Sequence, residues 1–168
     1  MKWSVLPLWL LLATCRILED AGPARADRIP MGTLLDLHRD LTIPPDQAGI
    51  FIQGKPIGDR DRDDNASRLE VRSIALTPRT VRADRFTVVR VVQDWERFSQ
   101  RETGLRRARL DYDSPALLRF STALYLHSDR QPGVFRRVCS HLQDSAQNSR
   151  YLTAAEIRTV LAPVVTWP

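Results

Sequence analysis

Apolar and polar residues alternate along most of this chain, and this period of two restricts its fold more than any other feature. In residues 34–43, "LLDLHRDLTI", the apolar side of the pattern consists of Leu35, Leu37, Leu41 and Ile43. Such alternation is typical of a β-strand that buries one face. The pattern therefore predicts a strand over residues 34–43.

The same reasoning predicts strands in most of the chain that follows. The expected strands are "AGIFIQG" (48–54), "RLEVRSIAL" (68–76), "RFTVVRVVQDW" (85–95) and a hairpin over residues 117–142 whose turn is "RQPG". Residues 85–95 carry β-branched side chains on both faces, which is typical of a central strand. Residues 96–115 are polar, and they could hold a short strand around 105–110 or an amphipathic turn.

Near the end of the chain the period changes to that of a helix. Thr153 and Glu156 have the spacing of a capping box, and Ile157, Val160 and Leu161 form one apolar stripe. Six or seven strands and one short C-terminal helix predict a mainly β protein. The expected fold is a single antiparallel β-sandwich or barrel-like domain over residues 27–168.

Residues 1–26 are expected to direct export. The apolar run 3–14 is too short to span a bilayer of about 30 Å and has the length of a signal-peptide core. "ARA" (24–26) suits a signal peptidase, whereas "LATC" (12–15) is similar to a lipobox, whose cysteine, Cys15, would be acylated. We therefore expect a periplasmic or secreted protein without a transmembrane helix after processing, and outer-membrane anchoring through Cys15 is the alternative.

The acidic stretch 59–70, "DRDRDDNASRLE", has the spacing of a twelve-residue calcium loop. Its candidate ligands are Asp59, Asp61, Asp63, Asn65, Ser67 and Glu70. Asp64 stands where such a loop needs glycine, three arginines reduce the negative charge, and the flanking segments are predicted strands. The sequence therefore favours a hairpin loop, with weak calcium binding as the alternative.

Cys139 and His141 form the second candidate site. On a strand they share one side, about 6.6 Å apart along the chain. A thiol beside a base could act as a nucleophile or as half of a zinc site, but no further partner is predicted near them. A lone cysteine in an exported protein is more often a small buried side chain. No cofactor motif is present, and we predict that the protein is not an enzyme.

The chain is basic, with a net charge of +5 and a pI near 9.9. Its arginines are dispersed, and only short pairs occur, at 106–107 and 136–137. No basic run is interleaved with aromatic residues, so nucleic acid is not an expected partner. The expected partners are an envelope protein or an anionic component of the envelope, such as a lipid headgroup.

The order of segments resembles a family of short exported proteobacterial proteins, known as hypothetical proteins or lipoproteins. The most specific pieces are "IPPDQAGIFIQG" (43–54) and "SDRQPGVFRRVC" (128–139). The resemblance implies an envelope location and a β-rich domain, and it carries no known activity. In that family a cysteine often stands near the place of residues 65–68 and could pair with the one that matches Cys139. This chain lacks it.

The sequence thus predicts an exported envelope protein that acts as a non-enzymatic binding or accessory module. One alternative is a small-ligand or calcium-binding protein that uses the loop 59–70. The other is a cysteine-dependent enzyme that uses Cys139 and His141.

Overall fold

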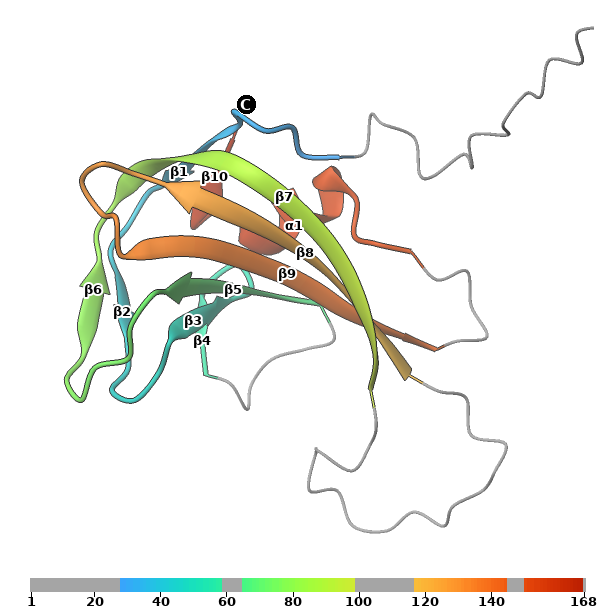
Figure 1. Cartoon of the computed structure of the whole chain (residues 1–168), viewed down its shortest axis with the longest axis horizontal. Helices are drawn as coiled ribbons and strands as arrows, with labels where there is room; N and C mark the ends of the chain where they lie inside the picture. Colours follow the sequence, from blue (N-terminus) through green and yellow to red (C-terminus); the bar gives the residue numbers. More distant parts are fainter. Residues whose placement is uncertain (1–27, 59–64, 99–116, 145–149, 168) are drawn as a thin grey trace, which may run out of the picture.

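The structure, a computed structural model, describes residues 28–58, 65–98, 117–144 and 150–167 (Figure 1). Its elements are β1 (Leu34–Leu37), β2 (Leu41–Ile43), β3 (Gly49–Ile52), β4 (Pro56–Ile57), β5 (Ala66–Val71), β6 (Arg79–Val81), β7 (Asp84–Phe98), β8 (Leu117–His127), β9 (Val134–Asp144), α1 (Ala154–Leu161) and β10 (Val165–Thr166). The fold is mainly β with one short C-terminal helix, as the sequence predicts.

Eight strands form one curled antiparallel sheet in the order β10-β1-β7-β8-β9-β5-β3-β4, which has the form of a half-barrel (Figure 1). β2 and β6 form a separate two-stranded sheet. β1 and β10, which are the first and the last strand of this sheet in chain order, pair with each other: Asp36 lies opposite Thr166 and Leu37 opposite Val165. Helix α1 packs against β5 and β10.

The predicted hairpin and helix are confirmed. β8 and β9 pair over their length around the turn at residues 128–133, and Thr122 lies opposite Cys139. Helix α1 begins after Thr153, whose side chain and that of Glu156 form both halves of the predicted capping box. Among the described residues, no helix has the length and apolar character needed to cross a bilayer.

The prediction of one strand over residues 34–43 is wrong. β1 pairs with β7 and β10 in the large sheet, whereas β2 pairs with β6 in the small one. The polar residues between them make a turn, where the Asp40 carboxylate accepts a hydrogen bond from the backbone N–H of Ala83 at 2.8 Å. The buried alternation nevertheless holds on both sides of this turn.

The strand predicted over residues 68–76 starts earlier and ends earlier, as β5 over 66–71. Beyond Val71 the chain leaves the sheet, and the Arg79 guanidinium donates hydrogen bonds to Ser73 and to the carbonyl oxygen of Gln47. These bonds hold residues 72–78 as a loop between β5 and β6.

The core lies on the concave side of the half-barrel. Alternate residues of β1, β3, β5, β7, β8 and β9 point into it, and α1 and β10 add apolar side chains from the C-terminal segment. The large side chains that are almost fully buried are Arg137, Leu35, Leu41, Ile43, Ile52, Leu69, Leu124, Ile157, Leu161, Val88, Val164 and Val165. One member of this set, Arg137, is charged.

Candidate functional site

Arg137 is built into the middle of the apolar core by the alternation of β9. Its neighbour Arg136 points to the convex side, where it pairs with Glu70, so Arg137 must point to the concave side. Only 2% of Arg137 is exposed. The residues directly opposite it on the two adjacent strands are Leu69 and Leu124, and both are buried.

The Arg137 guanidinium is left without partners for two of its nitrogens. Nε and Nη1 are buried and make no hydrogen bond within the described part of the chain. Buried polar atoms are satisfied in the great majority of cases, and a buried charge without a partner costs several kcal/mol. Such an atom marks either a cost that the fold tolerates or a place where a ligand completes the site.

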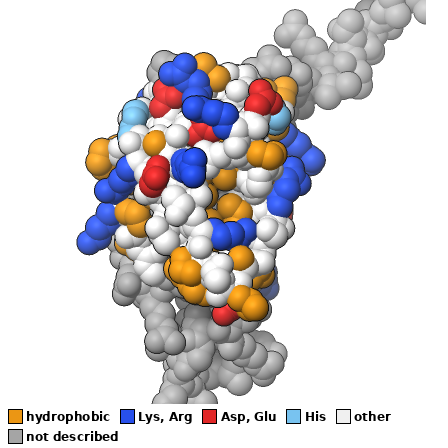
Figure 2. Space-filling view, turned by 90° about the vertical axis from the view of Figure 1, so that its left-hand side faces the viewer, with side chains coloured by type: hydrophobic (Ala, Val, Ile, Leu, Met, Phe, Trp, Pro, Cys, Tyr) orange, Lys and Arg blue, Asp and Glu red, His pale blue; other side chains and the backbone are white. Residues whose placement is uncertain are grey.

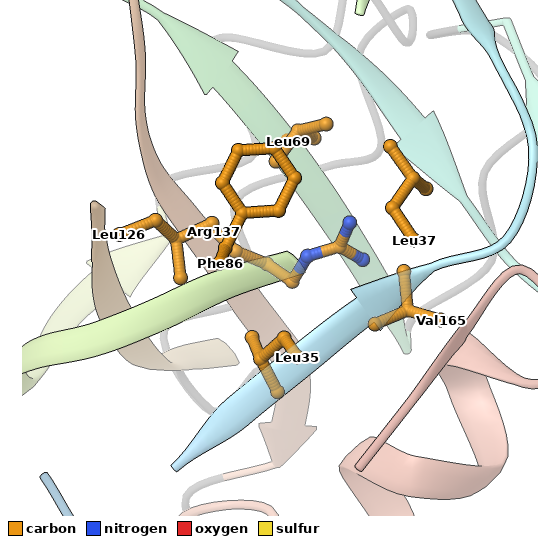
Figure 3. A pocket seen from close by; sticks show the side chains of 7 residues that line it. All are labelled: Leu35, Leu37, Leu69, Phe86, Leu126, Arg137 and Val165. Atoms are coloured by element: carbon orange, nitrogen blue, oxygen red, sulfur yellow. The ribbon is translucent and has the colours of Figure 1, made fainter. Parts of the chain in front are cut away.

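The guanidinium reaches into a small cavity with apolar walls (Figure 3). The other lining residues are Leu35, Leu37, Leu69, Phe86, Leu126 and Val165, which come from β1, β5, β7, β8 and β10. The space open to the centre of a water-sized sphere is about 10 Å³. This is close to the smallest space that holds one water molecule.

Arg137 keeps its charge at neutral pH. Burial lowers the pKa of the guanidinium from its ordinary value to about 10, and the nearby Cys139 opposes this shift. A pKa near 10 still leaves the group protonated at pH 7. The cavity therefore contains a positive charge that none of its other lining residues neutralises.

A larger hollow on the surface lies next to this cavity, with Leu37 lining both. Its volume is about 580 Å³, and its lining residues are Asp36, Leu37, His38, Asp84, Arg85 and Arg130. The Asp36 carboxylate is bound by Arg85 in a two-bond ion pair, with distances of 2.6 and 3.2 Å. The hollow therefore presents paired charges, and its carboxylates are already occupied.

Asp84 anchors the turn between β8 and β9. Its carboxylate accepts hydrogen bonds from Ser128 at 2.6 Å, from Gln131 at 3.1 Å, from Arg130 and from the backbone N–H of Arg85. Burial alone would raise the pKa of Asp84, but these donors outweigh it and lower the pKa to about 2. We assign this group a structural role.

The candidate calcium ligands that the structure describes do not converge. Ser67 and Glu70 lie on β5, three residues apart, and therefore point to opposite faces of the sheet. Ser67 faces Cys139, whereas Glu70 pairs with Arg68 and Arg136. Asn65 is exposed, and its backbone carbonyl oxygen accepts a hydrogen bond from the side-chain amide of Gln53 at 2.5 Å.

The three aspartates Asp59, Asp61 and Asp63 lie outside the described residues, as does Cys15. In the part of the chain that is described, no three His, Cys, Asp or Glu side chains gather closely enough to hold a metal ion.

Cys139 and His141 share the concave face, as their spacing predicts, but each has another partner. The Cys139 thiol is 1% exposed and lies 2.6 Å from the hydroxyl of Ser67. Burial raises the pKa of this thiol, which disfavours the reactive thiolate. The His141 ring donates from Nε2 to the carbonyl oxygen of Arg150 at 2.7 Å and packs edge-on against Phe120.

The sequence by itself presents Arg137 only as one of a set of dispersed arginines. A signal for its burial was present, because Arg137 stands two residues before Cys139 and so shares its face on a strand. A cysteine expected to be buried thus implies a buried arginine beside it. The leucines of β1 and β5 that surround the guanidinium come from distant segments, and the sequence does not show that they meet.

Comparisons of this chain with protein family models, with characterised proteins and with solved structures find no match.

Proposed function

We propose that this chain is an exported, non-enzymatic binding module of the bacterial envelope, and that it binds a small monoanion with an apolar body through Arg137. The class of ligand that we propose is a medium-chain carboxylate. The observation that carries the proposal is the buried guanidinium of Arg137, charged and unpaired at two nitrogens, in an apolar cavity.

The chemistry of the cavity wall favours this kind of ligand over an inorganic oxyanion. Phosphate or sulfate would need several hydrogen-bond donors, and Arg137 is the only donor side chain among the residues that line the cavity. A carboxylate needs one charged partner and can accept two parallel hydrogen bonds from a guanidinium. Its hydrocarbon part would lie against leucine, valine and phenylalanine side chains.

The proposed ligand would enter the cavity from the surface hollow, past Leu37. Leu37 lines both the cavity and the surface hollow, and Arg85 and Arg130 lie in that hollow. The cavity holds only about one water-sized sphere, so the body of the ligand must displace apolar side chains, with Leu37 the first of them. Binding is therefore expected to be slow and to depend on the side chain at position 37.

The exported location and the lack of catalysis rest on other features. Residues 1–26 have the composition of an export signal, and the basic chain suits an anionic envelope. The thiol of Cys139 is buried and has a raised pKa, which supports a structural role rather than nucleophilic catalysis.

The test is a calorimetric titration of the protein with decanoate, with decanol and with a decyl ammonium salt, in a buffer without chloride. We expect heat and thermal stabilisation with decanoate alone, because only the anion neutralises Arg137. The Arg137→Met variant is expected to lose the response to decanoate.

A matched control is Arg136→Met, which removes the adjacent arginine on the opposite face and should leave decanoate binding unchanged. Equal binding of decanol would show that the charge plays no part. If chloride alone produced the full stabilisation, the site would be a halide site and the apolar body would be unnecessary.

A further inference from the structure

The loop 72–78 between β5 and β6 exposes two large apolar side chains. Ile74 is 62% exposed and Leu76 is 85% exposed. The loop runs at the lower left of Figure 1, and the side of the molecule seen in Figure 2 shows hydrophobic side chains gathered at its lower end. Two large exposed apolar side chains this close together on one loop form a candidate contact surface.

The backbone of this loop is held in place. The Asp46 N–H donates to the carbonyl oxygen of Ala75 at 2.9 Å, which ties the loop to the preceding β2–β3 turn. The Arg79 guanidinium also bonds to the Ser73 hydroxyl at 3.0 Å. The tip is thus presented in a fixed conformation, so little order has to be gained when it meets a partner.

A row of arginines adjoins the loop on the convex face of the sheet. The Arg72 guanidinium, two residues before Ile74, lies 5.4 Å from the centre of the Phe135 ring, and Arg136 lies 5.2 Å from the same ring. Arg68 lies over Phe51 and Arg90 over Tyr125 in the same manner. The only carboxylate among the described residues paired with this row is Glu70.

This arrangement selects among anionic partners. Guanidinium groups cover these rings, so the rings are not free to stack with nucleic-acid bases. Four arginines against one glutamate leave an excess of positive charge whose N–H groups can bind phosphate. Apolar side chains beside a basic surface are the combination that binds an anionic bilayer: the charges attract the headgroups, and the apolar groups enter the interface.

We propose that the Ile74/Leu76 loop and the adjoining arginine row dock the protein on an anionic phospholipid surface. Ile74 and Leu76 insert at the level of the headgroups, and Arg72, Arg90 and Arg136 contact lipid phosphates. This surface is distinct from the Arg137 cavity on the concave side, and the proposal does not depend on that site.

The test is a fluorescence titration with an environment-sensitive NBD label at the tip of the loop. The label is placed on a Leu76→Cys variant in a Cys15→Ser background, because Cys139 is 1% exposed and will not react in the folded protein. Vesicles of phosphatidylcholine are compared with vesicles that also contain phosphatidylglycerol. We expect a blue shift and a rise in intensity with the anionic vesicles only.

Two further variants test the two halves of the surface. Ile74→Ser is expected to abolish most of the spectral change, and Arg72→Glu to weaken vesicle binding at least about fivefold, because one basic residue near an anionic surface contributes about that factor. The matched control is the label on a Trp95→Cys variant. Trp95 is 57% exposed and lies on the face of β7 opposite to Arg90, so its label should not respond.

The label reports on the loop itself, so attachment of vesicles through the apolar run 3–14 cannot imitate the result. Vesicle binding with an unchanged label at position 76 would overturn the proposal. An equal response to neutral vesicles would overturn it as well. So would a response to a soluble polyanion, such as heparin or DNA, that exceeds the response to anionic vesicles.

Discussion

Replacing Arg137 by methionine is expected to make the ligand-free protein more stable. The cost of burying this guanidinium follows from its pKa, which folding lowers by about 2.5, to about 10. One pKa unit corresponds to about 1.4 kcal/mol, so the penalty is about 3 kcal/mol at pH 7. Methionine is apolar and flexible, and it can fill much of the same space without a charge.

The expected result is a rise of about 3 kcal/mol in the free energy of unfolding, or about 6–12 °C in melting temperature for a protein of this size. Urea unfolding followed by circular dichroism, in a buffer without chloride or carboxylates, measures it. The folded-state pKa of Arg137 lies below the unfolded-state value, so the penalty is complete below pH 10 and disappears as the pH rises from 10 toward the ordinary pKa of arginine. The advantage of the variant should shrink over this interval.

The neighbouring substitution Arg136→Met provides the contrast. Arg136 is paired with Glu70 on the convex face, so its loss should lower the free energy of unfolding by about 1 kcal/mol. The substitutions at these two adjacent arginines are thus expected to change the free energy of unfolding in opposite directions. A loss of stability in Arg137→Met would refute the reasoning, because it would mean that a bound anion or water already compensates the charge.

Four other substitutions test the structure away from this site. Asp84→Asn should lower the free energy of unfolding at pH 7 by about 2 kcal/mol, as measured by urea unfolding. Because folding lowers the pKa of Asp84 from 3.8 to about 2, this difference from the wild type should vanish as the pH falls from 4 to 2. Gly49→Ala should cost more than about 2 kcal/mol in the same assay, since a Cβ there collides with the backbone of β5, whereas Gly133→Ala has open space and should change stability by less than about 0.5 kcal/mol. In Ser67→Cys, the new cysteine should form a disulfide with Cys139 under oxidising conditions and raise the free energy of unfolding by about 2–4 kcal/mol. The reason is that the Ser67 and Cys139 side chains already lie 2.6 Å apart on paired strands. A thiol titration that still finds both cysteines free would contradict this geometry.

Much of the large sheet could be predicted from the sequence, because its long strands carry enough residues for the period of two to be visible. β7, β8 and β9 each have eleven residues or more, and the hairpin of β8 and β9 was predicted with its turn. β4, β6 and β10 have two or three residues each, too few to show a period. Their pairing is decided by distant partners rather than by local sequence.

The turn that separates β1 from β2 was missed for a related reason. Leu35, Leu37, Leu41 and Ile43 keep the alternation on both sides of it, so the pattern by itself cannot show that the chain changes sheets. The clustering of arginines with aromatic residues on the convex face of the sheet was also not predicted. Arginines and aromatic residues are interleaved there across five strands, from Phe51 to Arg90, although no single run of sequence interleaves them.

The pairing of β1 with β10 has a consequence for the order in which the protein folds. Residues 36 and 166 must meet, and so large a separation in sequence makes the closure slow and late. Val165 of β10 is also a wall of the Arg137 cavity. A growing chain therefore cannot close the Arg137 cavity until residues 165–166 have been made and have paired with β1, so the proposed ligand could bind only after this pairing.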